Sequence, residues 1–148
     1  MTDPLTIAIA SDHAGLELKR HMIDAAEQWR VQLSDLGPAD MTSVDYPDYA
    51  HLLAQGITRG TYRLGILVCG TGLGMSMAAN RHPGVRAAVC TETFAARMAR
   101  QHNNANVLCL GARVVGVGLA EDIVREFLAH DFEGGRHARR VDKIELPS

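Results

Sequence analysis

The sequence has few cysteines, few aromatic residues and no long hydrophobic run. Its 148 residues include three cysteines and seven scattered histidines, with no CxxC or HExxH motif. Cys69, Cys90 and Cys109 each close a strand-like segment, and an odd number placed in this way does not suit a disulfide framework. We therefore expect a reducing compartment, the cytoplasm, and no metal site.

Neither the charge nor the hydropathy points to nucleic acid or to a membrane. The formal net charge is −2. No apolar run approaches the roughly 20 residues that span a bilayer. Residues 1–6 lack the basic and apolar regions of a secretion signal, so we expect none. With 47% hydrophobic and 22% charged residues, the sequence predicts one soluble globular domain over residues 1–148.

Short β-type segments alternate with helical segments along the whole chain. Strands are expected at residues 5–10, 31–36, 64–69, 85–90 and 106–110. Helices are expected at residues 15–29, 46–60, 73–80, 93–102 and 117–130, followed by a polar tail from residue 131. The third strand is almost entirely apolar, as in a parallel sheet covered on both faces. The pattern predicts an α/β fold: a doubly wound, Rossmann-like, five-stranded parallel sheet with helices on both faces.

The spacing of apolar residues in the helical segments predicts which side chains face the core. In the second helix Tyr49, Leu52, Leu53 and Ile57 are expected to face inward, and in the fifth Leu119, Ile123 and Phe127 are expected to pack. Shared faces are expected for Leu18, Met22, Ala26 and Trp29 in the first helix and for Ala95, Met98 and His102 in the fourth.

The most informative segment is 66–75, in which an apolar strand runs through Cys69 into a glycine-rich turn. Glycines free backbone N–H groups to face an oxyanion or a phosphate, and the following helix adds its positive N-terminal end. Fields of this kind favour a thiolate, which makes Cys69 a candidate thiolate beside an anion site. A tight strand-to-helix turn with a structural cysteine explains the segment equally well.

Other glycine-loop motifs fit this segment less well. A P-loop requires Gly-Lys-Ser/Thr, and the segment contains no lysine. Met75 stands where a dinucleotide-binding fingerprint needs glycine and where a Cys-x5-Arg phosphatase loop needs arginine. Glu92 lies near the place of a ribose-binding acid, so the dinucleotide hypothesis is weakened but stays open.

Other reactive side chains follow the predicted strands or lie near the ends of helices. They are Asp12, His13, Thr71, His102, Asn103, Arg113, Arg136 and Arg140. Each has an ordinary alternative, because an aspartate can cap a helix, a histidine can complement a helix dipole, and loop or tail residues can simply be solvated. Parallel sheets bind ligands beyond the carboxyl ends of their strands. We therefore expect one cysteine, two histidines, an aspartate and the glycine loop to share one rim.

Together the motifs resemble the family of type B ribose-5-phosphate isomerases, which also holds allose-6-phosphate and galactose-6-phosphate isomerases. The matching segments are 11–15, 45–47, 69–74, 78–81, 84–87, 100–103, 111–116 and 134–137. The resemblance implies an aldose–ketose isomerase for ribose 5-phosphate and ribulose 5-phosphate in the pentose phosphate pathway. A six-carbon sugar phosphate isomerase is the alternative within the family, and a non-catalytic sugar-phosphate or nucleotide-binding module is the alternative outside it.

The same resemblance implies a role for each matching residue. Cys69 is the base that moves a proton between C2 and C1, Thr71 assists the hydroxyl protons, and His102 opens the sugar ring. The implied substrate-binding residues are Asp12, His13, Gly70, Gly72, Leu73, Gly74, Asn103, Arg113, Arg136 and Arg140. Some family members lack the cysteine and use a glutamate at the position of Met75, so this chain resembles the cysteine type.

The family also implies an assembly. Its members are homodimers with sites at the subunit interface, and they use no metal or organic cofactor. We therefore expect a homodimer, or a tetramer, in which the C-terminal tail at about residues 131–148 contacts the partner subunit.

Overall fold

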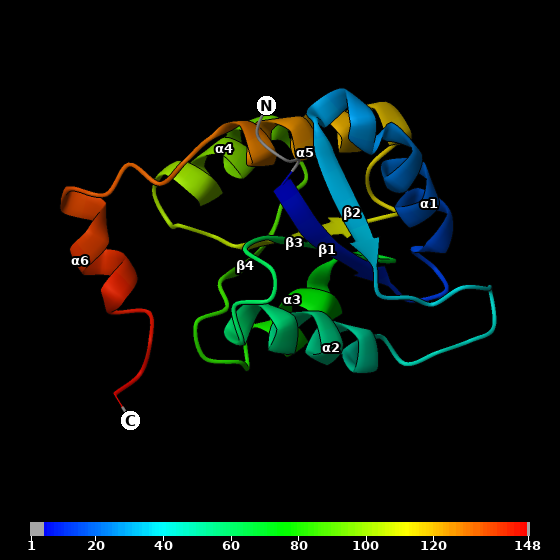
Figure 1. The fold of residues 1–148 in the computed structure, drawn as a ribbon, viewed down its shortest axis with the longest axis horizontal. Helices are drawn as coiled ribbons and strands as arrows, with labels where there is room; N and C mark the ends of the chain where they lie inside the picture. Colours follow the sequence, from blue (N-terminus) through cyan, green and yellow to red (C-terminus); the bar gives the residue numbers. More distant parts are fainter. Residues whose placement is uncertain (1–4, 148) are drawn as a thin grey trace.

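All five strands of the sheet run parallel, in the order β2-β1-β3-β5-β4 (Figure 1). The computed structural model describes residues 5–147. The strands are β1 (Leu5–Ser11), β2 (Val31–Asp35), β3 (Gly65–Cys69), β4 (Ala87–Val89) and β5 (Val107–Gly111). The predicted parallel α/β sheet is therefore confirmed.

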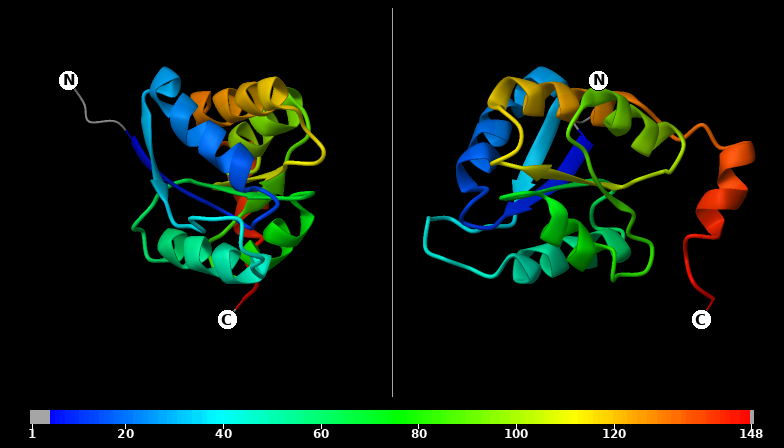
Figure 2. Two further views of the ribbon diagram at one scale, coloured as in Figure 1. Left: turned by 90° about the vertical axis from the view of Figure 1, so that its right-hand side faces the viewer. Right: turned by 180° about the vertical axis from the view of Figure 1, so that it is seen from behind.

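Helices cover both faces of the sheet, as Figure 2 shows in the view along its edge. One layer contains α1 (Leu16–Ala25), the short 3-10 helix η1 (Ala26–Trp29), α4 (Thr93–Gln101) and α5 (Val117–Ala129). The other contains α2 (Tyr46–Thr58) and α3 (Leu73–Ala79). Helix α6 (Arg136–Asp142) stands apart from both layers in Figure 1 and in the right-hand view of Figure 2. None of the helices within residues 5–147 has the length and apolar character needed to cross a membrane.

The core has two parts, one on each side of the sheet. Every residue of β3 and β5 is buried, because strands in the middle of a covered sheet have no solvent face. Side chains alternate between the layers, so Val68 packs toward α1 and α5 whereas Cys69 packs toward α2 and α3. Cys69, the last residue of β3, thus belongs to the core and also lies at the carboxyl end of the strand.

The helix faces differ in part from their predictions. Leu52 and Leu119 are 47% and 41% exposed, and the alanines Ala50, Ala54 and Ala120 face the sheet instead. In α4 the buried residues are Ala96, Ala99 and Arg100, and the face with Met98 and His102 is half-buried. Small side chains let a helix lie close to the sheet, and the larger neighbours then lie to one side of the contact.

The strand expected at 85–90 is shorter than predicted. The side-chain amide of Asn80 bonds both the N–H and the C=O of Ala87, at 2.7 and 2.9 Å. The Asn106 side chain accepts the N–H of Arg86 at 2.8 Å. A side chain thus replaces a backbone acceptor for the Arg86 N–H, and Asn80 occupies the free side of Ala87, where β4 begins.

The segment expected to be a polar tail contains α6. Gly134 and Gly135 have φ angles of +68° and +55°, which turn the chain before the helix. His137 and Val141 lie one turn apart and are both buried, which gives α6 an inner face. Residue 148 of the predicted tail lies outside the described residues.

Candidate active site

The sheet has a topological switch point between β1 and β3. The chain leaves β1 toward α1 on one face and leaves β3 toward α3 on the other face. Loops that diverge in this way open a crevice at the carboxyl ends of the strands, where α/β proteins bind ligands. The predicted site segments Asp12–His13 and Cys69–Gly74 occupy the two sides of this crevice.

Cys69 ends β3 and directs its sulfur back toward the glycine loop. The Gly72 N–H donates a hydrogen bond to the Cys69 Sγ at 3.1 Å, and the side chain is buried. Gly72 has a φ of +82°, a left-handed conformation that favours glycine. A backbone N–H directed at a reactive sulfur provides fixed stabilisation for negative charge.

Asp12 is held tightly between β3 and the start of α1. Its N–H donates to the Val68 carbonyl at 3.1 Å, and its Oδ1 accepts the Gly15 N–H at 2.9 Å. A Cβ atom on Gly15 would lie 2.3 Å from that carbonyl oxygen, so the close approach of α1 to β3 requires glycine. Asp12 therefore does not cap α1, whose N-cap is Gly15, but its bond to the Gly15 N–H fixes the carboxylate at the crevice.

His13 is oriented by the loop that precedes α2. The Val44 N–H donates to the His13 Nδ1 at 3.2 Å. A backbone N–H can only donate, so Nδ1 is the acceptor and the proton of a neutral ring is assigned to Nε2. His13 therefore has an Nε2–H group available to donate to a ligand.

Arg113, Thr71 and Tyr46 complete this side of the crevice. The Arg113 guanidinium lies over Gly70, with its Nη1 3.6 Å from where a Cβ atom would stand. The Thr71 Oγ1 accepts the Leu73 N–H at 3.2 Å and so ties the loop to the start of α3. The Tyr46 ring packs against Gly74, where a Cβ would lie 2.6 Å from the ring. Tyr46 was not among the predicted site residues, although it lies in the matching segment 45–47.

His102 and Asn103 lie at the amino ends of the strands, opposite the crevice, contrary to the prediction of one shared rim. They follow α4 and precede β5, whereas Cys69 pairs with Gly111 at the far end of β5. The physical reason is that a connecting helix runs antiparallel to the strands, so its C-terminus returns to their amino ends. Figure 1 places α6, which carries Arg136 and Arg140, on this same side.

His102 forms a cluster with two residues of the C-terminal segment. Its ring stacks on that of His137 with centroids 4.1 Å apart, and its Nε2 lies 3.8 Å from Glu133. Burial and then the neighbouring His102 lower the pKa of His137. His137 was not among the predicted site residues, although it lies in the matching segment 134–137.

The same three residues bring potential metal-ligand atoms within 4.8 Å of one another, the one such group found within residues 5–147. The two rings are nearly parallel, with an interplanar angle of 15°. Imidazole lone pairs lie in the ring plane, so the two rings do not direct their lone pairs at one point. As arranged, the cluster suits proton exchange and stacking better than metal coordination.

A cavity of about 350 Å³ lies at the amino ends of the strands, near Asn103. Asn103, Arg86 and Glu145 contribute polar groups to its lining, and Ile144 contributes an apolar one. One chain thus has two separate groups of predicted site residues, one at the carboxyl ends of the strands and one at their amino ends.

Comparison with known proteins finds relatives along nearly the whole chain. The sequence model of a family described as Ribose/Galactose Isomerase matches residues 7–144. A Mycoplasma pneumoniae protein named probable ribose-5-phosphate isomerase B is 52% identical over 139 residues, covering 93% of this chain and 91% of the relative.

Solved structures agree with this similarity. Ribose-5-phosphate isomerase B of Clostridium thermocellum is 51% identical, with a TM-score of 0.92 and coverage of 95% of both chains. The Mycoplasma genitalium enzyme with bound ribulose-5-phosphate is 47% identical, with a TM-score of 0.90 and coverage of 95% of this chain and 93% of the other.

Proposed function

The chain belongs to the ribose/galactose isomerase family, and from this premise we propose that it interconverts D-ribose 5-phosphate and D-ribulose 5-phosphate. The observation that carries the proposal is the Cys69 thiol at the switch point, with the Gly72 N–H 3.1 Å from its sulfur. A relative that is 47% identical binds ribulose-5-phosphate. The reaction is an internal redox exchange between neighbouring carbons, and its proposed cellular role is in the pentose phosphate pathway in the cytoplasm.

The proton transfer begins on the open-chain aldose. The Cys69 thiolate takes the proton from C2, the C2 electrons form the C1–C2 double bond, and the carbonyl π electrons move to O1. Backbone amides of the loop formed by Gly70, Gly72, Leu73 and Gly74 stabilise the resulting enediolate. Thr71 assists the transfer of the hydroxyl proton from O2 to O1. Cys69 then returns the proton to C1, which leaves the carbonyl at C2.

When the substrate is the furanose form, ring opening must precede this step, because the C1 carbonyl exists only in the open chain. In the proposal, His102 supplies acid catalysis for opening the ring, Asp12 lies near the ring oxygen, and Asn103 bonds the sugar hydroxyls. The stacked neighbour His137 has a lowered pKa and so stays uncharged at neutral pH. An uncharged neighbour avoids repulsion when His102 carries its proton.

The phosphate is held by donors that suit a dianion. His13 offers its Nε2–H, and Arg113 lies over the loop at Gly70. Arg136 and Arg140 add guanidinium groups from α6, whose planar forks match phosphate oxygens. Binding energy from the remote phosphate can then orient C1 and C2 against the thiolate.

A second copy of the chain is needed to complete this site. The five residues of β5 place the amino and carboxyl ends of the strand roughly 13 Å apart, at the rise per residue of a parallel strand. Acid, base and substrate must lie within hydrogen-bonding distance of one another. We therefore propose that His102, Asn103, Arg136 and Arg140 act in the crevice of the partner subunit, as expected for a symmetric dimer or for a tetramer built as a dimer of dimers.

Exposed apolar side chains support such an assembly. Leu73 and Met77 on α3 are 53% and 68% exposed, and Phe94 on α4 is 59% exposed. Large apolar side chains of this kind gather at subunit interfaces. In this proposal each subunit is one domain, and its C-terminal segment contacts the partner.

The test is an isomerase assay run with three substrates. We expect kcat/KM for ribose 5-phosphate to exceed that for allose 6-phosphate and galactose 6-phosphate. In deuterated buffer, the product should carry deuterium at the carbon that receives the proton. The control is Cys69→Ala in the same buffer, which should incorporate none.

Two results would contradict the proposal in different ways. A higher kcat/KM for a six-carbon substrate would transfer the activity to the other branch of the family. Tight binding of ribose 5-phosphate without turnover or exchange would identify a binding module instead of an enzyme.

A further inference from the structure

Lys19 is one of the largest completely buried side chains within residues 5–147, with 0% exposure. It lies on α1, one turn after Gly15, where the helix begins beside the candidate active site. Burying an ammonium group is costly unless it is both paired and hydrogen-bonded. Its partners therefore indicate which part of the molecule depends on this charge.

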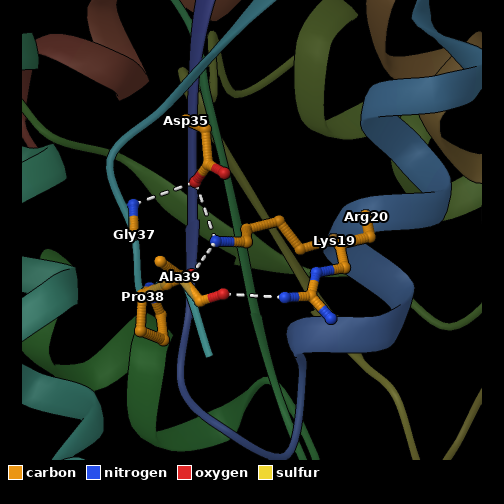
Figure 3. Close-up of polar contacts among 6 residues, drawn as sticks. All are labelled: Lys19, Arg20, Asp35, Gly37, Pro38 and Ala39. Atoms are coloured by element: carbon orange, nitrogen blue, oxygen red, sulfur yellow. Dashed lines mark hydrogen bonds and ion pairs between the residues drawn. The ribbon is translucent and has the colours of Figure 1, made fainter. Parts of the chain in front are cut away.

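The Lys19 ammonium holds the turn that follows β2 (Figure 3). Its Nζ lies 2.7 Å from the Asp35 Oδ1 and 2.6 Å from the Pro38 carbonyl oxygen. The same Asp35 oxygen accepts the Gly37 N–H at 2.9 Å. The next residue of α1, Arg20, donates to the Ala39 carbonyl at 2.7 Å. Lys19 and Arg20, consecutive residues of α1, thus donate hydrogen bonds to the carbonyls of Pro38 and Ala39, consecutive residues of the turn.

This turn is joined directly to the candidate active site. The Gly37 carbonyl accepts the Ser11 N–H at 3.1 Å, next to Asp12. From the turn the chain continues to Val44, whose N–H donates to the His13 Nδ1 at 3.2 Å. The intervening bond from the Thr42 N–H to the Asp40 Oδ1, at 3.0 Å, is local and does not anchor the loop to the sheet.

We propose that Lys19 is a positioning residue: by fixing the turn 35–39 it places loop 39–44 so that the Val44 N–H holds the His13 ring with its Nε2–H directed at the ligand. The identity of that ligand as a sugar phosphate rests on the proposed function. The positioning of His13 itself does not, and it can be measured without substrate.

The burial of the two partners differs, and this difference makes a clean variant available. The Asp35 side chain is 43% exposed, so water can solvate its carboxylate when Lys19 is replaced. Lys19→Met keeps an unbranched chain of similar length in an apolar environment without leaving a buried charge. Asp35→Asn would instead leave a buried ammonium without a counter-ion, and it would confuse positioning with unfolding.

The experiment compares Lys19→Met with Phe127→Leu, which alters a buried residue of α5 outside the site. For Lys19→Met we expect KM for ribose 5-phosphate to rise about tenfold while kcat changes less than about twofold, as when ground-state binding is lost. Hydrogen exchange of the backbone amides in 37–44 should accelerate. Nitrogen NMR of His13 should detect a mixture of tautomers in place of the Nε2–H form. Phe127→Leu should lose stability without any of these changes.

The proposal is overturned if Lys19→Met keeps slow exchange in 37–44 and the Nε2–H tautomer of His13. It is equally overturned if Phe127→Leu reproduces all the changes, since they would then report general loosening. Should Lys19→Met fail to fold, Lys19→Gln replaces it. The glutamine side chain is one bond shorter than that of lysine, so its amide does not reach the Asp35 carboxylate or the Pro38 carbonyl. If the wild-type protein isomerises no sugar phosphate, the proposed function fails, and the exchange and NMR results still decide the role of Lys19.

Discussion

At the scale of single residues, the three cysteines differ in chemistry although all three are buried. Burial and then the nearby Glu92 raise the pKa of Cys90 to about 11. Burial within the sheet raises the pKa of Cys109 further. At neutral pH both are therefore neutral thiols that act as small apolar side chains. Cys69 differs because a backbone N–H is directed at its sulfur from the glycine loop.

Replacing Cys69 by alanine tests this distinction. We expect Cys69→Ala to lower kcat about 1,000-fold or more, because a positioned proton-transfer group contributes factors of this order. Affinity for ribulose 5-phosphate, measured by calorimetry, should change less than about threefold, since the phosphate ligands remain. The control is Cys90→Ala, which should keep its kcat. Retained turnover in Cys69→Ala would exclude this thiol as the base.

At the scale of the elements, the close contact between α1 and β3 determines where Asp12 and His13 lie. A Cβ on Gly15 would lie 2.3 Å from the Val68 carbonyl oxygen, and backbone cannot rotate away as a side chain can. We expect Gly15→Ala to lower the free energy of unfolding by about 3 kcal/mol or more and to impair activity. Urea unfolding measures the first effect.

Gly118 in α5 provides the matched control. Nothing lies within 4 Å of a Cβ built there, and its φ is not positive. Gly118→Ala should therefore raise the free energy of unfolding by about 0.5–1 kcal/mol, the usual gain of alanine over glycine in a helix. Equal effects of the two substitutions would show that helix propensity, and not the contact with β3, decides the outcome.

A pair of histidines links α2 to the turn after α3. The His51 Nδ1 and the His82 Nε2 are 2.7 Å apart, which requires one of them to lack a proton. Burial and then the proximity of His51 lower the pKa of His82. The folded protein therefore binds this proton less readily than the unfolded chain does, and the difference lowers stability as the pH falls through the ordinary histidine value of about 6.5.

We therefore expect the urea midpoint of the wild-type protein to fall between about pH 7.5 and about pH 5.5, through this pair among other groups. His82→Gln should reduce that fall, and His51→Gln should reduce it less, because it removes the contact but leaves the burial of His82. An unchanged fall in both variants would contradict the assignment.

Much of the fold was predictable because its signals are local. The apolar segment before Cys69 and the glycines after it indicated a buried strand and a turn, and both are present. The helix at Arg136–Asp142 was missed because its buried face consists only of His137 and Val141, and a histidine among arginines gives no apolar periodicity. The burial of Lys19 depends on Asp35 and Pro38, which lie 16 and 19 residues away, so no local pattern signals it.

The candidate site was predicted less completely because it depends on orientation. Sequence motifs identified His102. Its position at the amino ends of the strands is determined by the direction of α4, which runs antiparallel to the strands and which the motifs do not specify. The tautomer of His13 likewise depends on Val44, which is 31 residues away. Contacts between distant segments therefore carry the information that the sequence patterns lacked.

At the scale of the whole molecule, the separation of Cys69 from His102 makes a quantitative prediction about mixed subunits. If each site takes its base from one subunit and His102 from the other, a dimer of Cys69→Ala with His102→Gln has one doubly defective site and one intact site. Random exchange of equal amounts makes half of the dimers mixed, so about a quarter of all sites should be active. We expect the mixture to recover about a quarter of wild-type turnover while each variant alone stays inactive, measured after subunit exchange at low denaturant. The control is the double variant Cys69→Ala/His102→Gln mixed with either single variant, which should recover nothing. Absence of recovery, with exchange verified by a mass-tagged subunit, would place both residues in a site formed within one chain.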